Sequence, residues 1–177
     1  MRSVLGGCDV GTLAAFNLKR WIDEHLSLLK PPVGNVLVFK DSNFQVMIVG
    51  GPNQRNDYHV DPGEELFFQI EGDIVLKVIE DGTPRDLPIR EGEMLLLPPF
   101  VPHSPQRPAA TVGMVIERER LPEEEDRFRW YCQGCGAILH ESALHVVDLG
   151  TQLKPILEGF KNNESLRTCK TCGRVSP

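Results

Sequence analysis

The sequence predicts a mainly β protein, with short antiparallel strands arranged as a barrel or sandwich and a small metal-binding tail. The first sign is the 16 glycines and 14 prolines among 177 residues, which exceed the usual share and favour many turns. The second is a series of short β-branched or aromatic runs between residues 36 and 119, each closed by turn-forming residues as strands are. The third is a pair of Cys-x-x-Cys motifs near the C-terminus, which indicates a metal site.

The length fits one main domain, because 177 residues can bury one core but are too few for two full domains. We expect residues 1–15 to be a loose lead-in, residues 16–126 to form the main domain, and residues 127–177 to form a cysteine-bearing extension packed on it. The acidic run at 121–126 is typical of a solvated connector. We therefore expect this run to mark the edge of the domain and to contribute no site.

The elements follow in order along the chain. Asn17 can cap a helix with a broad apolar face, and Lys30-Pro31-Pro32 ends it. The strand-like runs follow at 36–39, 44–51, 65–70, 73–79, 93–98 and 111–117. A last helix is expected around residues 151–162, with Pro155 in its first turns.

Charge and composition exclude several classes of protein. A net charge of −6 without a block of Lys and Arg argues against a nucleic-acid surface and favours a small-molecule ligand. No apolar run approaches the roughly 18 residues that span a bilayer. Too few residues precede Cys8 for a lipoprotein signal. Because paired cysteines without a signal peptide indicate a reducing compartment, we expect a cytoplasmic protein.

Two histidines and an acid form the candidate metal site. His59 and Glu65 flank a Pro-Gly turn, and His103 stands in a separate segment. Two His and one carboxylate can occupy one face of an octahedral iron(II) ion. About three coordination positions then remain for dioxygen and a bidentate substrate. Strand alternation allows only one of Glu64 and Glu65 to face the metal but does not choose between them. Each histidine alone could instead be a buried hydrogen-bonding residue.

The spacing of these residues resembles the two short motifs of the cupin family, whose fold is a double-stranded β-helix or jelly-roll barrel. The matching positions are His59, Glu65, Gly72, Gly92, Pro98 and His103. The spacing to Gly72 selects Glu65 over Glu64. Three positions depart from the usual pattern, because Asp57, Phe100 and Arg107 stand where cupins have His, Gly and Asn. The usual four-ligand site is thereby reduced to three ligands.

Two arginines and a second acid lie near these motifs. Arg55 precedes His59 by four residues and Arg107 follows His103 by four, so regular strands would turn each arginine toward the face of its ligand. Two buried guanidiniums are costly unless an anion joins them, which predicts a carboxylate substrate. Solvation at the surface is the alternative for both. Glu117 could likewise be solvated, or it could meet an amino group or manage a proton.

The four paired cysteines predict a second metal site. They are Cys132, Cys135, Cys169 and Cys172. Two such pairs can give a closed tetrahedral thiolate site with a structural role, for which zinc and iron are both plausible. Disulfides are the alternative in an oxidising compartment. A nucleic-acid zinc ribbon lacks the basic and aromatic face that it would need.

Longer stretches make the chain resemble a known family. They are KPPVGN (30–35), VGGPNQRNDYH (49–59), EELFFQ (64–69), LLLPPFVPHSPQRP (95–108), VIERER (115–120), FRWYC (128–132) and DLGTQ (148–152). Over about residues 16–173, the chain resembles the short form of the 3-hydroxyanthranilate 3,4-dioxygenase family, which carries a rubredoxin-like C-terminal metal site.

The resemblance implies an iron(II) enzyme of the kynurenine pathway that converts 3-hydroxyanthranilate and dioxygen to 2-amino-3-carboxymuconate semialdehyde, toward quinolinate and NAD. Three residues would hold the catalytic iron: His59, Glu65 and His103. Glu65, Arg107 and Glu117 would contact the carboxylate-bearing substrate. Arg55 would help to position dioxygen or the same acid. The family also suggests a homodimer. A cupin enzyme of another reaction type and a non-enzymatic cupin that binds a small acid are the alternatives.

Overall fold

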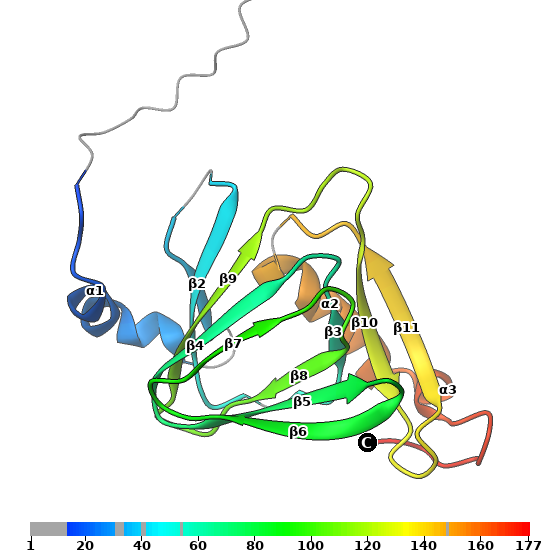
Figure 1. The fold of residues 1–177 in the computed structure, drawn as a ribbon. Coiled ribbons are helices and arrows are strands. Elements are labelled where there is room, and N and C mark those ends of the chain that lie inside the picture. The colour runs from blue at the N-terminus through cyan, green and yellow to red at the C-terminus, as the bar shows by residue number, and fades with distance from the viewer. Residues whose placement is uncertain (1–13, 31–33, 40–41, 54, 148) are drawn as a thin grey trace, which may run out of the picture.

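The computed structural model describes residues 14–30, 34–39, 42–53, 55–147 and 149–177, so most of the predicted lead-in at 1–15 lies outside the described residues. Two antiparallel β-sheets face each other and form the body of the protein (Figure 1). The predicted mainly β barrel is confirmed.

The first sheet contains five strands in the order β1, β2, β9, β4, β7. In this order their bounds are Asn35–Leu37, Phe44–Gly50, Val112–Arg118, Glu65–Glu71 and Met94–Leu97. The second sheet contains six strands in the order β11, β10, β3, β8, β5, β6. Their bounds are Ile138–Leu144, Asp126–Tyr131, Tyr58–Val60, His103–Gln106, Ile74–Glu80 and Thr83–Ile89. Neighbouring strands run antiparallel throughout.

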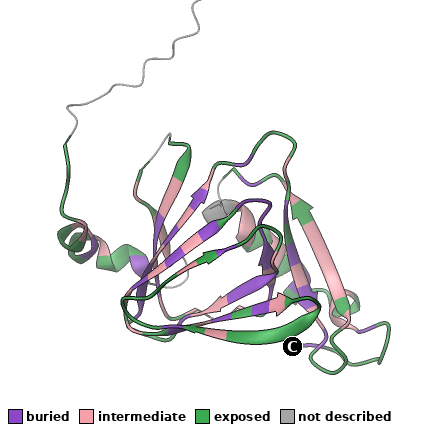
Figure 2. Cartoon of the chain, viewed as in Figure 1, coloured by how far each residue is buried: buried purple, intermediate pink, exposed green. Residues whose placement is uncertain are grey.

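The interior of the barrel is apolar except for a few polar groups. Buried and partly buried residues alternate along β4 from Glu65 onward, as a strand with one face in the core requires (Figure 2). The apolar side chains form one cluster between the sheets: Met47, Phe67, Ile74, Leu76, Val78, Ile89, Leu97 and Val115. Strand register sets Glu65 opposite Glu117 and His59 opposite His103. These pairings bring four polar side chains into the interior of the barrel.

The N-terminal helix forms where the sequence predicts it. Helix α1 spans Leu18–His25, and the side chain of Asn17 caps it by accepting a hydrogen bond of 2.9 Å from the backbone N–H of Arg20. A 3₁₀ helix, η1 (Leu26–Leu29), continues it. The buried face of these helices packs on Ile48 of β2 and Val112 of β9, so they cover part of the first sheet.

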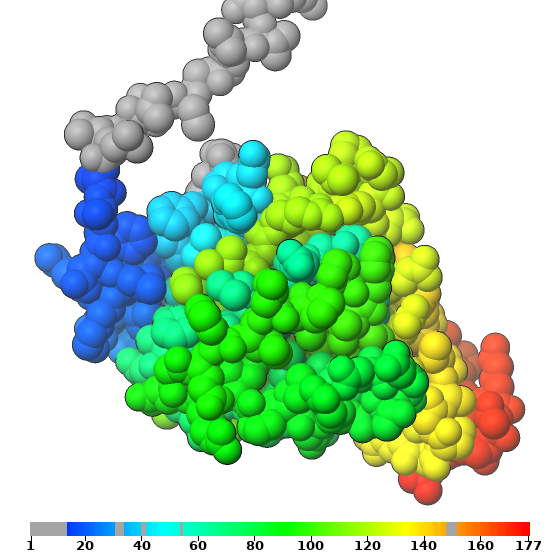
Figure 3. Space-filling model, in the orientation of Figure 1, coloured from blue at the N-terminus to red at the C-terminus, as the bar shows by residue number. Residues whose placement is uncertain are grey.

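The C-terminal extension is joined to the barrel through a strand. β10 pairs with β3 and so continues the second sheet. Helix α2 (Leu149–Lys161) contains Pro155, as predicted, and helix α3 (Glu164–Arg167) follows. Trp130 of β10 stacks on Phe160 of α2 with 4.3 Å between ring centroids. In the space-filling view, this end of the chain and α1 lie on opposite sides of the barrel (Figure 3).

The prediction that the acidic run at 121–126 is wholly solvated is wrong at its last residue. Glu123 and Glu125 are exposed, but Asp126 is fully buried. Asp126 is the first residue of β10, and the pairing of β10 with β3 places its carboxylate beside His59 at 2.6 Å. The sequence of the run does not show this, because the burial of Asp126 arises from a contact between distant segments.

Within the described part of the chain, no helix is long and apolar enough to cross a membrane.

Candidate metal centres and binding pocket

The three predicted ligands meet inside the barrel. His59 lies on β3, Glu65 begins β4 and His103 begins β8. Glu65 Oε1 lies 3.5 Å from His59 Nδ1 and 3.0 Å from His103 Nε2. All three side chains are buried, whereas Glu64 is exposed. Only Glu65 of the acidic pair can therefore reach the histidines.

The surroundings of these residues fit a bound metal ion. Glu65 Oε1 is buried, yet it has no hydrogen bond of good geometry. The nitrogens of the two imidazoles that face away from Glu65 each have an acceptor, which is Asp126 Oδ2 at 2.6 Å for His59 Nε2 and the Val101 carbonyl at 3.0 Å for His103 Nδ1. Metal-binding histidines usually have such a second partner, because it fixes the ring and its tautomer. Two imidazoles and one carboxylate are a donor set that suits iron(II).

Electrostatics keep the carboxylate of this group ionised. Burial raises the pKa of Glu65, but the imidazoles of His103 and His59 lower it more, to about 2. An ionised carboxylate is the form that binds a cation.

A cavity of about 570 Å³ opens over the three residues, a size that suits a small organic ligand. All six of the predicted active-site residues line it: Arg55, His59, Glu65, His103, Arg107 and Glu117. Apolar walls come mainly from the first sheet, including Met47, Phe67 and Val115, and α2 adds Leu153 and Leu157. The C-terminal extension therefore contributes one wall of the pocket.

Arg107 brings an unpaired positive charge to this cavity. Its side chain is buried, its Nε has no hydrogen-bond partner, and no acidic side chain among the described residues forms an ion pair with it. One guanidinium nitrogen donates to Gln69 Oε1 at 3.3 Å. Burial and the nearby charge of Arg55 lower the pKa of Arg107 to about 10. An anionic ligand would relieve this uncompensated charge.

Arg55 is held by Asp57, the residue that replaces the first histidine of the cupin motif. The Arg55 guanidinium donates through Nε at 3.1 Å and through a second nitrogen to the two carboxylate oxygens of Asp57, which is fully buried. Burial raises the pKa of Asp57, but Arg55 outweighs this effect and lowers it. The departure from the cupin pattern thus exchanges a metal ligand for a residue that orients an arginine in the pocket.

Glu117 faces the cavity from β9. Its Oε2 accepts a hydrogen bond of 3.0 Å from Arg120, and its Oε1 is buried without a partner. Burial and the negative charge of Glu65 raise the pKa of Glu117 well above its usual value. This raised pKa favours the protonated form of the carboxyl, which can donate a hydrogen bond.

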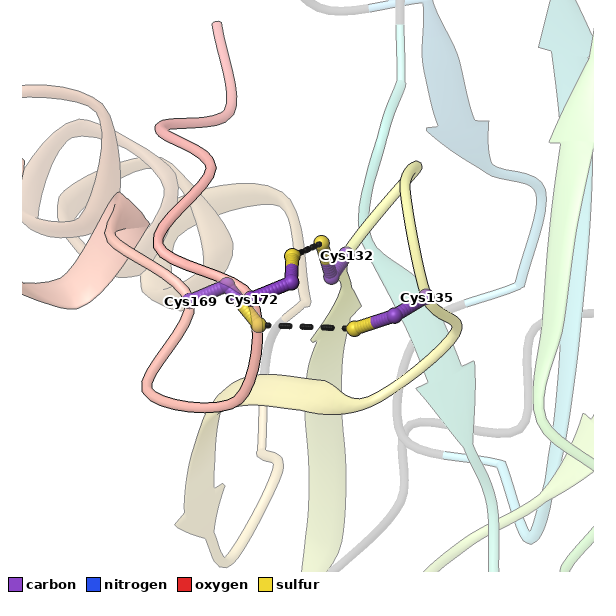
Figure 4. A group of neighbouring side chains, drawn as sticks. All are labelled: Cys132, Cys135, Cys169 and Cys172. Carbon is purple, nitrogen blue, oxygen red and sulfur yellow. Dashed lines mark hydrogen bonds between the residues drawn. The ribbon is translucent and has the colours of Figure 1, made fainter.

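The second candidate metal centre is the four-cysteine cluster of Cys132, Cys135, Cys169 and Cys172. Its sulfurs converge from two turns (Figure 4), with 3.6 Å between Sγ of Cys132 and Cys172 and 3.5 Å between Sγ of Cys135 and Cys169. All four cysteines are free, and these distances exceed the roughly 2.05 Å of a disulfide bond. The geometry favours the predicted tetrahedral metal site over disulfides.

Matching turns build this four-cysteine cluster. Gly136 and Gly173 each follow the second cysteine of a pair and have φ angles of 73° and 75°, which favour glycine. Backbone N–H groups of the second turn, led by that of Cys172, lower the pKa of the Cys169 thiol to about 6. A thiolate is the form that binds zinc or iron.

The sequence analysis missed Asp61, Arg120 and Asp126, which are buried beside the predicted ligands. Arg120 pairs with both of these acids, at 2.7 Å from Asp61 and 2.6 Å from Asp126. The only signal was the position of Asp61 in the Pro-Gly turn between His59 and Glu65. The remaining histidines, His25, His140 and His145, belong to none of the groups that could hold a metal among the described residues.

The two facing antiparallel sheets and the buried group of two histidines and one carboxylate match the cupin barrel that the sequence predicts, with residues that could hold a metal ion. A cupin-2 domain-containing protein from Shewanella frigidimarina is 20% identical, with a TM-score of 0.46 over 55% of this chain and 91% of that chain.

A family model, 3-hydroxyanthranilic acid dioxygenase, matches residues 11–161. Relatives named 3-hydroxyanthranilate 3,4-dioxygenase are 54% identical in Xanthomonas campestris, over 91% of both chains, and 55% identical in Neurospora crassa, over 89% of this chain and 87% of the relative. One from Jannaschia sp. is 51% identical over 93% of this chain and 92% of its own. The chain therefore belongs to the 3-hydroxyanthranilic acid dioxygenase family, as the resemblance predicted.

Proposed function

We propose that the chain is an iron(II)-dependent dioxygenase that opens the ring of 3-hydroxyanthranilate to give 2-amino-3-carboxymuconate semialdehyde, a step of the kynurenine pathway toward quinolinate and NAD. Family membership supports the reaction. One structural observation carries the proposal. The buried group of His59, Glu65 and His103 shares a cavity with Arg107, an arginine without an acidic partner among the described residues.

His59, Glu65 and His103 would hold the iron, and the cavity lies on the open side of this group. Bound iron would supply an electrophilic centre at which dioxygen and the neighbouring hydroxyl and amino groups of the substrate come together. The protein's part is to place these reactants in one geometry and to exclude water with apolar walls.

Arg107 would bind the carboxylate of the substrate, because a buried guanidinium pairs with a carboxylate through two parallel hydrogen bonds. Glu117, with its raised pKa, would donate a hydrogen bond to the same end of the substrate or manage a proton. Arg55, fixed by Asp57, would position dioxygen or contact the same acid.

The four-cysteine cluster would hold a structural iron or zinc ion, and its free thiols suit a reducing compartment such as the cytoplasm. A homodimer would cover the exposed apolar side chains of the first sheet. Phe44 and Leu96 are 64% and 54% exposed, and both border one groove with Leu66 and Ile116. Such a patch is typical of an interface.

Oxygen uptake tests the proposed reaction. The iron(II)-loaded protein is mixed anaerobically with 3-hydroxyanthranilate and given a pulse of oxygen, and the product is identified by mass. We expect one dioxygen consumed per substrate and both oxygen atoms in the product. Substrate binding without oxygen uptake would indicate a binding protein, and oxygen uptake with another product or substrate would indicate a different cupin enzyme.

A further inference from the structure

Arg120 is the centre of a buried network outside the pocket. It is 5% exposed, and its guanidinium lies within 3.0 Å of carboxylate oxygens of Asp61, Glu117 and Asp126. Both oxygens of Asp126 accept from it, at 2.8 Å and 2.6 Å. This two-pronged contact fixes the plane of the Asp126 carboxylate.

Each of the three acids connects Arg120 to a different part of the candidate site. Asp126 accepts from His59 Nε2 at 2.6 Å. Asp61 accepts from the backbone N–H of Gly63 at 2.6 Å, within the turn that separates His59 from Glu65. Glu117 faces the cavity. One guanidinium therefore contacts the partner of a metal ligand, the turn between two ligands and a substrate-facing acid.

Strand β10 restrains His59 in a second way. Phe128, two residues after Asp126, is the cross-strand partner of His59. Its ring stacks on the imidazole with 5.0 Å between centroids and 8° between planes. Stacking fixes the plane of the imidazole, and the hydrogen bond to Asp126 fixes its direction within that plane. Two side chains of β10 therefore restrain the ring of His59.

We propose that Asp126, held by Arg120, is a positioning residue that aims the Nδ1 atom of His59 at the iron and sets the affinity of the catalytic site for the metal. This inference rests on the proposed function, because it takes His59 to be an iron ligand. Asp126 and Arg120 are both buried, and Oδ2 of Asp126 accepts one hydrogen bond from His59 and one from Arg120. These two features distinguish the Asp126–Arg120 contact from a surface ion pair. Loss of such a partner typically weakens metal binding by about 10- to 100-fold.

Iron retention tests the proposal without relying on turnover. Wild type, Asp126→Asn, Asp126→Ala and the control Glu124→Gln are loaded with iron(II) and equilibrated with increasing concentrations of a chelator. Glu124 is a matched control because it pairs with Arg118 in the same segment but contacts no ligand. His59→Ala gives the iron that is held by the four-cysteine cluster, and this amount is subtracted.

We expect Asp126→Ala to lose catalytic-site iron at about 10- to 100-fold lower chelator concentration, Asp126→Asn to fall between it and wild type, and Glu124→Gln to match wild type. The nitric oxide adduct of the bound iron should also change its electron paramagnetic resonance spectrum in both Asp126 variants. Asp126→Asn keeps the size of the side chain. If Asp126→Ala does not fold, the iron retention and the spectrum of Asp126→Asn therefore test the positioning role.

Iron retention equal to that of wild type in folded Asp126→Asn, with an unchanged spectrum, would overturn the positioning role and leave the proposed function intact. Equal iron retention by wild type and His59→Ala would instead refute the catalytic site itself.

Discussion

The two candidate metal centres of this chain differ in depth, in ligand chemistry and in the backbone that holds them. His59, Glu65 and His103 are buried on strands of both sheets and border a cavity. The four-cysteine cluster lies on two turns, and Cys135 and Cys172 are exposed. Three nitrogen and oxygen ligands beside a cavity leave room for reactants, whereas four thiolates close the coordination shell. The comparison therefore contrasts a candidate site that has room for reactants with a candidate site that four thiolates would close.

Removing one ligand from the barrel should have the largest effect. His59→Ala or Glu65→Ala should lose catalytic iron and lower turnover by roughly a thousandfold or more, because the bound metal contributes several kcal/mol to the reaction. Oxygen uptake and iron content measure this. Glu64→Ala, at the exposed neighbour, is the control and should behave as wild type. Full turnover in either ligand variant would exclude that residue as a ligand.

The same experiment on the four-cysteine cluster should give the opposite pattern. Cys169→Ser should release the metal of the tail and lower the melting temperature, because metal binding and folding of this segment are coupled. Turnover should stay within about threefold of wild type, because the packing of Trp130 on Phe160 still holds α2 against the barrel. Complete loss of turnover in a folded variant would contradict a purely structural role.

Arg107 should affect substrate binding more than the chemical step. Arg107→Ala removes a charge-assisted pair of about 1.5–3 kcal/mol, so KM should rise by roughly 10- to 100-fold. Arg107→Lys keeps the positive charge but cannot make two parallel hydrogen bonds to a carboxylate, so its KM should lie between those of wild type and Arg107→Ala. Steady-state kinetics with varied 3-hydroxyanthranilate checks this. An unchanged KM in Arg107→Ala would remove this residue from the substrate site.

The smallest effects concern the turns beside the two centres. The cysteine turns place glycines at positive φ, but the turn before His103 places Phe100 at φ 63°, where cupins usually have glycine. Phe100→Gly should therefore raise the free energy of unfolding by up to about 1 kcal/mol, and Gly136→Ala should lower it by about 1 kcal/mol. Denaturant unfolding of metal-loaded protein measures both changes. If both substitutions changed the free energy of unfolding in the same direction, the positive φ angle would not determine the stability of these turns.

Local signals in the sequence predicted most of the fold and both candidate centres. The cap at Asn17, the alternating strand runs and the cysteine turns each depend on neighbouring residues. The spacing of cupin motifs predicted the choice of Glu65 over Glu64, which alternation alone left open. In the structure, all six predicted pocket residues line one cavity.

The network of Asp61, Arg120 and Asp126 could not be predicted in the same way. Arg120 follows the end of β9 and Asp126 ends an acidic run, so their local sequence is typical of solvated residues. Their burial depends on the pairing of β10 with β3, a contact between segments distant in the chain. The pairing of Arg55 with Asp57 was also missed, because Asp57 was considered only as a lost ligand.

Anomalous diffraction at the iron edge tests the central claim most directly. Crystals grown anaerobically with iron(II) and 3-hydroxyanthranilate should show an iron peak in contact with His59, Glu65 and His103, with the substrate carboxylate on Arg107. Iron found only among the four cysteines, with none between the two histidines, would contradict the account.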